Sequence, residues 1–353
     1  MLSAASLAEL GYVSRDEPGI RRVRRAKSFT FLLPNGSPVR DADELARIRK
    51  LAIPPAWTDV WICLDPSGHL QATGRDARGR LQYRYHARWR EVRDQAKYHD
   101  VLAFAEHLPR LRKQVERDLA SPQLTKDKVL ATVVRVMEQT CIRVGNDRYA
   151  EANGSYGLTT LLDRHTTIHH GQVEFHFRAK GGKPYRAAIR DARLAKIVKR
   201  CRDIPGQRLF QYIDESGQYR PITSTDVNDY LRRAMGQPFT AKTFRTWAAT
   251  VGAATLLADC EPCSSQRAAR RTVLRVIEQV SVQLGNTPAI CRKSYVHPAI
   301  VEAYSGGTLH DLLKEGCRRA RRRASASGLR PEECVVLALF ERLNAQRSPR
   351  RAA

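Results

Sequence analysis

The chain has 353 residues, of which 61 are Lys or Arg and 36 are Asp or Glu, so its formal net charge is +25 and its isoelectric point is near 10.2. A compact chain with this surplus repels itself, so the simplest explanation of its charge is a polyanionic partner such as nucleic acid. The alternatives are that the protein associates with the ribosome, or that all proteins of its source are basic. No run of about 18 apolar residues occurs and the first residues lack a long apolar core, so we expect neither a membrane span nor a signal peptide.

Short alternating segments separated by turn residues fill the first quarter of the chain. They follow a basic cluster at residues 21–27 that fits the global charge. In the last segment, Gln82 and Arg84 face one side and Tyr83 and Tyr85 the other. Residues 1–92 are therefore predicted to form a small, mainly antiparallel β-sheet domain. Its strands are expected at residues 28–33, 60–64, 69–73 and 82–85, with a helix at 41–51.

A polar helical stretch at residues 89–97 is predicted to link this domain to a mainly α-helical domain at residues 93–353. A β-hairpin, or three-stranded sheet, is embedded among the helices, with alternating strands at 172–178 and 185–189 around the turn 179–183. The fold class is therefore α+β. Helices are predicted at residues 104–120, 126–144, 192–202, 224–234, 244–258, 264–285 and 332–343.

The eight cysteines are scattered and predict free thiols rather than a disulfide framework. The close pair Cys260 and Cys263 lacks the second pair that a zinc site needs. The carboxylates are dispersed and no HExxH motif occurs, so we expect no metal site and no cofactor.

Three basic residues and one tyrosine stand in contexts suited to phosphoryl transfer. Arginine binds two phosphate oxygens through its planar fork, and lysine can donate a proton to a leaving oxygen. Arg143 ends a predicted helix, Lys180 lies in the hairpin turn, and Arg245 begins an apolar helix from which its charge must point outward. Taken singly, the three are better explained by a helix cap, a solvated turn and a pair with a carboxylate. Tyr295 is one of 12 tyrosines, most of which simply pack.

Taken together, these residues carry a resemblance to a known family. The segments CIRVGNDRYA, FHFRAKGGK, AKTFRTW and LGNTPAICRKSYVHP occur in this order, and QYRY precedes them in the first domain. This set resembles the type IB DNA topoisomerases, especially the small viral and bacterial ones. The resemblance covers roughly residues 30 to 305 in both domains, whereas about 45 residues at the end of the chain match nothing in it.

The resemblance implies a division of labour. Tyr295 is the nucleophile that becomes linked to a DNA 3′ end, Arg143 and Arg245 stabilise the transition state, and Lys180 is the general acid for the 5′ oxygen. Family members often have a histidine nine residues before the tyrosine, where this chain has Asn286, an uncharged hydrogen-bond donor. The DNA contacts implied are Lys242 near the scissile phosphate, a strand in the major groove with Gln82, Tyr83 and Tyr85, and backbone contacts at Gly145 and Tyr149.

The implied activity is the nicking, swivelling and religation of one strand of double-stranded DNA by a monomeric, bilobed clamp in the cytoplasm, associated with the nucleoid. A phosphotyrosine keeps the free energy of the broken bond, so religation requires no ATP, and no GxxxxGK[ST] loop is present. With two arginines and a lysine in place of divalent cations, no metal is required for cleavage. The nearest alternative is a tyrosine recombinase, although these usually show His-x-x-Arg where this chain has Lys242-Thr-Phe-Arg245. A basic DNA-binding protein without catalysis is a third possibility. The preferred cleavage sequence and the role of residues 318–323 stay open.

Overall fold

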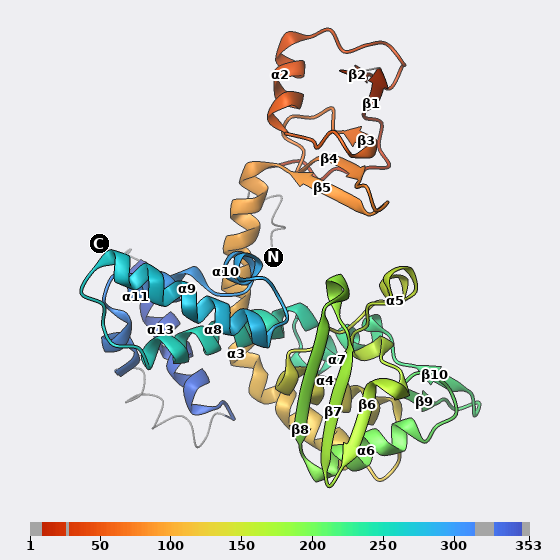
Figure 1. Ribbon diagram of the computed structural model, residues 1–353, viewed down its shortest axis with the longest axis vertical. Helices are drawn as coiled ribbons and strands as arrows, with labels where there is room; N and C mark the ends of the chain where they lie inside the picture. The colour runs from red at the N-terminus through yellow and green to blue at the C-terminus, as the bar shows by residue number, and fades with distance from the viewer. Residues whose placement is uncertain (1–8, 26–27, 315–327, 348–353) are drawn as a thin grey trace. The chain divides into compact units, whose positions relative to one another are not determined.

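The chain divides into two compact units, Met1–His99 and Asp100–Ala353 (Figure 1). Helix α3 (Ala87–Ala120) begins in the first unit and continues in the second, so the predicted linker at residues 89–97 lies within a longer helix. The basic cluster at 318–323 lies outside the described residues. The computed structural model describes residues 9–25, 28–314 and 328–347, except for the side chains of 90–99, 149 and 344–347.

The first unit contains a five-stranded antiparallel sheet with the strand order β2-β1-β3-β4-β5. Helix α2 (Ala42–Lys50) begins where the carboxylate of Asp41 accepts the backbone N–H groups of Asp43 and Glu44. The strands are β1 (Ile20–Arg25), β2 (Ser28–Leu32), β3 (Thr58–Ile62), β4 (Leu70–Arg75) and β5 (Leu81–Tyr85). The buried core consists of Ile20, Ile48, Val60, Ile62 and Ala72.

Strand β1 has the sequence IRRVRR, whose charge masks the alternation on which strand prediction depends. The guanidinium of Arg22 donates to the carbonyl oxygens of Pro54 and Trp57, at 3.0 and 2.6 Å, and lies 4.3 Å from the ring centroid of Phe29. These contacts give the Arg22 guanidinium two hydrogen-bond acceptors and an aromatic ring as neighbours beside the sheet. Residues 21–25 of the basic cluster therefore lie in a strand that the sequence did not reveal, and their role is partly structural.

The second unit is mainly α-helical, with a three-stranded antiparallel sheet, β6-β7-β8, and a separate two-stranded hairpin (Figure 1). Together with the sheet of the first unit, this confirms the predicted α+β class. The helices after α3 are α4 (Lys126–Thr140), α5 (Asp147–Asn153), α6 (Ala192–Arg202), α7 (Ser224–Met235), α8 (Ala241–Ala258), α9 (Gln266–Gln283), α10 (Pro288–Ser294), α11 (Pro298–Ser305) and α13 (Pro331–Arg347). The strands are β6 (Thr166–His169), β7 (Gln172–Arg178), β8 (Pro184–Arg190), β9 (Gln211–Ile213) and β10 (Tyr219–Pro221).

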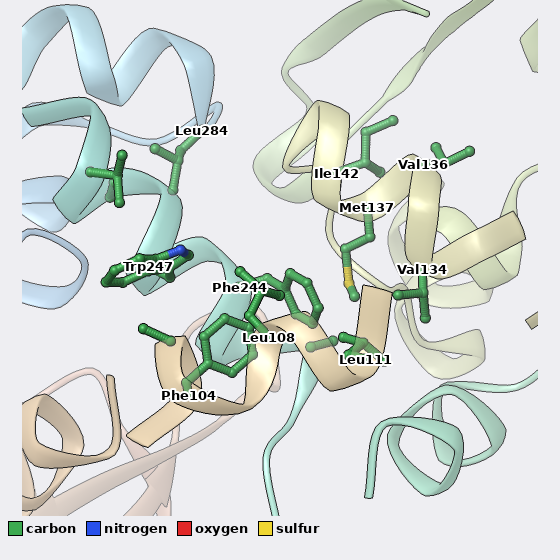
Figure 2. Close-up of a cluster of buried hydrophobic side chains, with 14 of the residues drawn as sticks. Phe104, Leu108, Leu111, Val134, Val136, Met137, Ile142, Phe244, Trp247 and Leu284 are labelled. Carbon is green, nitrogen blue, oxygen red and sulfur yellow. The ribbon is translucent and has the colours of Figure 1, made fainter. Parts of the chain in front are cut away.

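Helix α3 supplies the centre of the hydrophobic core of the second unit (Figure 2). The fully buried ring of Phe104 meets the ring of Phe244 on α8 edge-on, with centroids 4.8 Å apart. Leu108 and Leu111 follow along α3 toward Met137 of α4 (Figure 2). Since close-packed cores transmit small displacements, this packing fixes the start of α8 relative to the end of α4.

Two helices end earlier than the sequence predicts. Helix α4 ends at Thr140, because Cys141 adopts a left-handed conformation with φ 56° and its N–H bonds the carbonyl of Met137. The predicted helix 126–144 is therefore wrong in its last turn, and Arg143 lies in the following loop. Helix α9 ends at Gln283, before Gly285 with φ +59°. Both ends turn the chain sharply, which brings the residues that follow them into one region.

Helix α13 is anchored by a buried carboxylate. The side chain of Glu333 accepts two hydrogen bonds of 2.8 Å from Arg112 on α3 and one of 3.2 Å from the indole N–H of Trp247 on α8. Burial raises the pKa of Glu333, but the hydrogen bonds and charge of Arg112 outweigh it and the net shift is downward. Glu333 therefore couples the end of the chain to the helix that carries Arg245.

Replacing Glu333 with Gln is expected to lower the free energy of unfolding by about 3 kcal/mol at neutral pH, because it breaks a buried ion pair. Because the pKa of Glu333 is lower in the folded state than in the unfolded state, the ionised carboxylate stabilises the fold at pH values above the unfolded-state pKa. This contribution to stability is lost as the pH falls through the folded-state pKa. The deficit of Glu333→Gln should therefore shrink as the pH falls below about 4.3, the ordinary pKa of an unfolded Glu, and through the lower pKa of the folded state. Thermal unfolding across this range measures it, with Glu332→Gln as the neighbouring control. A deficit that does not change with pH would contradict this account.

Candidate active site

Arg245 lies in the second turn of α8 and is buried, with 4% of its surface exposed. The expectation that its charge points outward is therefore wrong. Its guanidinium instead donates to the carbonyl oxygen of Cys141 and, at 2.7 Å, to that of Leu284. Carbonyl oxygens accept from its Nη1 and Nη2 without neutralising its charge, and no carboxylate among the described residues pairs with it.

The two carbonyl partners of Arg245 belong to the loops that carry two other predicted residues. Cys141 lies two residues before Arg143, and Leu284 lies two residues before Asn286. Arg143 donates through Nη2 to the side-chain oxygen of Asn286, which joins the two loops directly. The structure thus brings Arg143, Arg245 and Asn286 into one cluster, although they are far apart in sequence.

Two N–H donors of this cluster, Arg245 Nε and Asn286 Nδ2, are buried without a hydrogen-bond partner among the described residues. Because Arg143 can only donate, the amide oxygen of Asn286 must face it, and the amide nitrogen is directed elsewhere. An unpartnered buried donor costs about 1–3 kcal/mol. Unsatisfied donors beside two arginines form a site that an anionic oxygen would complete.

Tyr295 follows α10 and has a non-helical backbone with φ −131° and ψ −38°. Its ring is half-buried, and the guanidinium carbon of Arg245 lies 5.2 Å from the ring centroid. Burial raises the pKa of Tyr295, but the charge and hydrogen bonding of Arg245, with the charges of Arg143 and Lys242, lower it overall. Lys242 itself is exposed in the first turn of α8. The phenol therefore lies where a negative oxygen is stabilised.

Lys180 makes no polar contact with this cluster within the described part of the chain. It is exposed and opens the short turn Lys180–Gly182 between β7 and β8. The turn is closed by a hydrogen bond of 2.8 Å from the N–H of Ala179 to the carbonyl of Lys183. No hydrogen bond or ion pair joins Lys180 to the arginines or Tyr295 within the part of the chain that the structure describes. The structure thus confirms the predicted hairpin turn but does not place its lysine in the cluster.

Tyr185 is a residue of the site that the sequence analysis missed. Its hydroxyl lies 2.6 Å from the carbonyl oxygen of Thr140, at the end of α4, and 3.1 Å from that of Gln283, at the end of α9. Its ring packs against Gly285, where an added Cβ would come within 3.0 Å. Tyr185 therefore ties strand β8 of the hairpin to both loops of the cluster. Only its place in an alternating strand hinted at burial.

The two predicted backbone contacts fall after α4. Gly145 has φ +100° and packs so closely on Gly157 that a Cβ on the latter would lie 2.6 Å from the Gly145 nitrogen. Only glycine tolerates this approach at both positions. Tyr149 lies in α5, and its side chain is outside the described residues.

The predicted DNA-contacting strand, β5, lies in the first unit and shows the expected alternation. Gln82 donates to the carboxylate of Asp76 at 2.9 Å, and Arg84 donates to the carbonyl of Ala52 at 2.9 Å. On the other face, the rings of Tyr83 and Tyr85 stack with centroids 5.9 Å apart. Tyr83 keeps 47% of its surface exposed, so an aromatic face is open to a partner.

Metal and membrane features are both lacking in the described ranges. Among these residues, no three His, Cys, Asp or Glu side chains are grouped so as to hold a metal ion. No helix in the same ranges is long and apolar enough to cross a bilayer.

Two family models match the chain. The model described as "Eukaryotic DNA topoisomerase I, catalytic core" matches residues 86–315. The model described as "Bacterial DNA topoisomerase IB, N-terminal domain" matches residues 28–76. The first covers the whole cluster around Tyr295, and the second covers most of the five-stranded sheet. Helix α13 lies beyond both.

Curated relatives agree with these models. The chain is 31% identical to "DNA topoisomerase 1B" of Acanthamoeba polyphaga mimivirus over 293 residues, which is 81% of this chain and 87% of the relative. It is 21% identical to "DNA topoisomerase I" of Monkeypox virus over 245 residues, or 69% of this chain and 74% of the relative. "DNA topoisomerase 1B" of Vaccinia virus (strain Copenhagen) matches to the same extent. With a catalytic-core model covering more than half of its length, the chain belongs to the type IB DNA topoisomerases, enzymes that break and rejoin one DNA strand.

Proposed function

We propose that Tyr295 is the nucleophile of this topoisomerase. Its phenolic oxygen attacks the phosphorus of a DNA phosphodiester, the bond from phosphorus to the 5′ oxygen breaks, and the 3′ phosphate stays on the tyrosine. The lowered pKa of Tyr295 supports this role, because it eases the loss of the phenolic proton. Religation reverses the step, so the energy of the broken bond is retained and no ATP is needed.

Arg143, Arg245 and Asn286 are proposed to bind the non-bridging oxygens of the phosphate. The observation that carries this proposal is the pair of buried, unpartnered donors on Arg245 and Asn286. Donors fixed before the substrate arrives stabilise a developing charge without reorganising. Asn286 supplies a hydrogen bond but no charge, so its contribution should be smaller than that of a histidine in the same place.

Lys180 is proposed to give its proton to the departing 5′ oxygen as that bond breaks. Its exposed position at the hairpin turn leaves the ammonium free to reach a bound duplex. Lys242 is proposed to contact the DNA backbone beside the same phosphate, supported by its effect on the pKa of Tyr295.

Domains 1–92 and 93–353 are proposed to hold double-stranded DNA between them as a clamp. Strand β5 would contact the major groove through Gln82, Tyr83 and Tyr85, while Gly145 and Tyr149 would approach the backbone. The exposed face of Tyr83 and the net charge of +25 support this arrangement. Since one chain carries every proposed catalytic residue, we propose that a monomer suffices, acting on the nucleoid in the cytoplasm.

The test is to incubate negatively supercoiled plasmid with the protein in EDTA without ATP. We expect relaxation through successive topoisomers, and protein trapped by detergent should be attached to 3′ ends. Strand exchange between paired specific sites without relaxation would instead indicate a recombinase. A mobility shift without any covalent adduct would indicate a DNA-binding protein without catalysis. Sequencing the trapped 3′ ends also reveals the preferred cleavage sequence.

A further inference from the structure

The hydroxyl of Thr250 bonds the backbone of the proposed nucleophile and that of the residue two positions after it. Thr250 lies on α8 and is fully buried. Its Oγ1 donates to the carbonyl oxygen of Tyr295 at 3.2 Å and accepts the backbone N–H of His297 at 3.1 Å. A hydroxyl has one proton to donate, and here it is directed away from the carbonyls of its own helix.

The segment held in this way is a short turn between two helices, and the ring of His297 in it also packs on Phe340 of α13, with centroids 4.4 Å apart. Residues 295–297 join α10 to α11, which begins at Pro298. The N–H groups of Tyr295 and Val296 both bond the carbonyl of Cys291, at 2.9 and 3.2 Å, which ties them to α10. The contacts of Thr250 therefore connect this turn to a different helix.

That helix also carries Arg245, which lies five residues before Thr250. Five residues span about 7.5 Å along an α-helix, so both side chains belong to one rigid element. Arg245 faces the ring of Tyr295, and Thr250 holds its backbone. The position of the phenol relative to the guanidinium is thus set through α8.

We propose that Thr250 is a positioning residue for the cleavage reaction: it fixes the backbone of Tyr295 so that the phenol meets the phosphate held by the arginines. This inference rests on the proposed role of Tyr295 as nucleophile. A displacement of about 1 Å can slow a reaction about 100-fold when the reacting groups must be aligned. Because the tyrosine oxygen is nucleophile in cleavage and leaving group in religation, both steps depend on the same alignment.

The test compares Thr250→Val, which keeps the shape but removes the hydroxyl, with Thr250→Ser, which keeps the hydroxyl. The assay measures how fast the covalent adduct forms in a single turnover on a DNA duplex that the enzyme nicks. The rate of religation and the DNA affinity are measured in parallel. Thr250→Val should slow cleavage and religation by similar factors of about 10 to 100 and leave DNA affinity unchanged. Thr250→Ser should restore most of the rate.

Thr132→Val is the matched control. Thr132 is equally buried in a helix, but its hydroxyl bonds only the carbonyl of Lys128 in its own helix, at 2.8 Å. It should keep the wild-type rate despite a similar loss of stability. If Thr250→Val does not fold, Thr250→Ala replaces it in the comparison with Ser.

Three results would overturn the proposal: a wild-type rate in Thr250→Val, an equal loss of rate in Thr132→Val, or a Ser variant as slow as the variant without the hydroxyl. The proposed function fails separately, through a Tyr295→Phe variant that still forms the adduct. A dead Tyr295→Phe with a fully active Thr250→Val would thus refute only the positioning role.

Discussion

Plasmid relaxation and the covalent adduct should both disappear in Tyr295→Phe, while DNA affinity stays nearly unchanged. The substitution removes only the oxygen proposed to attack and keeps the ring beside Arg245. The phosphate contacts that dominate affinity come from other residues. Relaxation of supercoiled plasmid, adduct formation and filter binding at one salt concentration measure the three quantities.

Tyr304→Phe is the matched control. Burial and a hydrogen bond with Cys263 raise the pKa of Tyr304, and its hydroxyl also bonds the carbonyl of Glu261 at 3.1 Å. The phenol of Tyr304 is thus held by hydrogen bonds to neighbouring residues and is poorly suited to attack a phosphate. The Tyr304→Phe variant should therefore relax plasmid normally. Adduct formation by Tyr295→Phe would place the nucleophile elsewhere and contradict the assignment.

A substrate with sulfur in place of the 5′ bridging oxygen should separate the role of Lys180 from that of Arg245. On ordinary DNA, Lys180→Ala and Arg245→Ala should each slow cleavage by at least about 100-fold, the scale of losing a general acid or an oxyanion donor. A thiol has a pKa of about 8.5 and leaves as the thiolate without a proton donor. The sulfur substrate should therefore rescue Lys180→Ala.

Arg245→Ala should remain slow on the sulfur substrate, because the non-bridging oxygens that it stabilises are unchanged. Single-turnover cleavage of the two substrates by the two variants gives the four rates needed. Rescue of both variants, or of neither, would contradict the separate roles proposed for Lys180 and Arg245. Since Arg245 also bonds the carbonyls of Cys141 and Leu284, its variant should be assayed well below its unfolding temperature.

The class of fold could be predicted because the local patterns agree with the structure in most segments. The alternation of QVEFHFR and the turn residues of AKGGK predicted the hairpin of β7 and β8. The sequence concealed β1, because the contacts that stabilise Arg22 come from residues about 30 positions away. It also could not show that α4 ends at Thr140, since a left-handed cysteine is not a usual helix terminator.

Within the candidate site, the residues could be named from the sequence but their contacts could not. Arg245 looked like a surface cation at the start of a helix, yet it is buried among carbonyl oxygens. Thr250 looked like one more small residue in an apolar helix. Its role depends on a turn 45 residues later in the chain, which no local pattern encodes.

The two arginines of this cluster, Arg143 and Arg245, repel each other in the folded protein. Burial and the neighbouring charge of Arg245 lower the pKa of Arg143, and the oxygens that accept hydrogen bonds from the two side chains are neutral. Within the described residues the two desolvated cations have no carboxylate partner, which weakens the free protein. A phosphate bound as proposed would supply a negative charge between them, so the substrate would act as the final structural component of its own binding site.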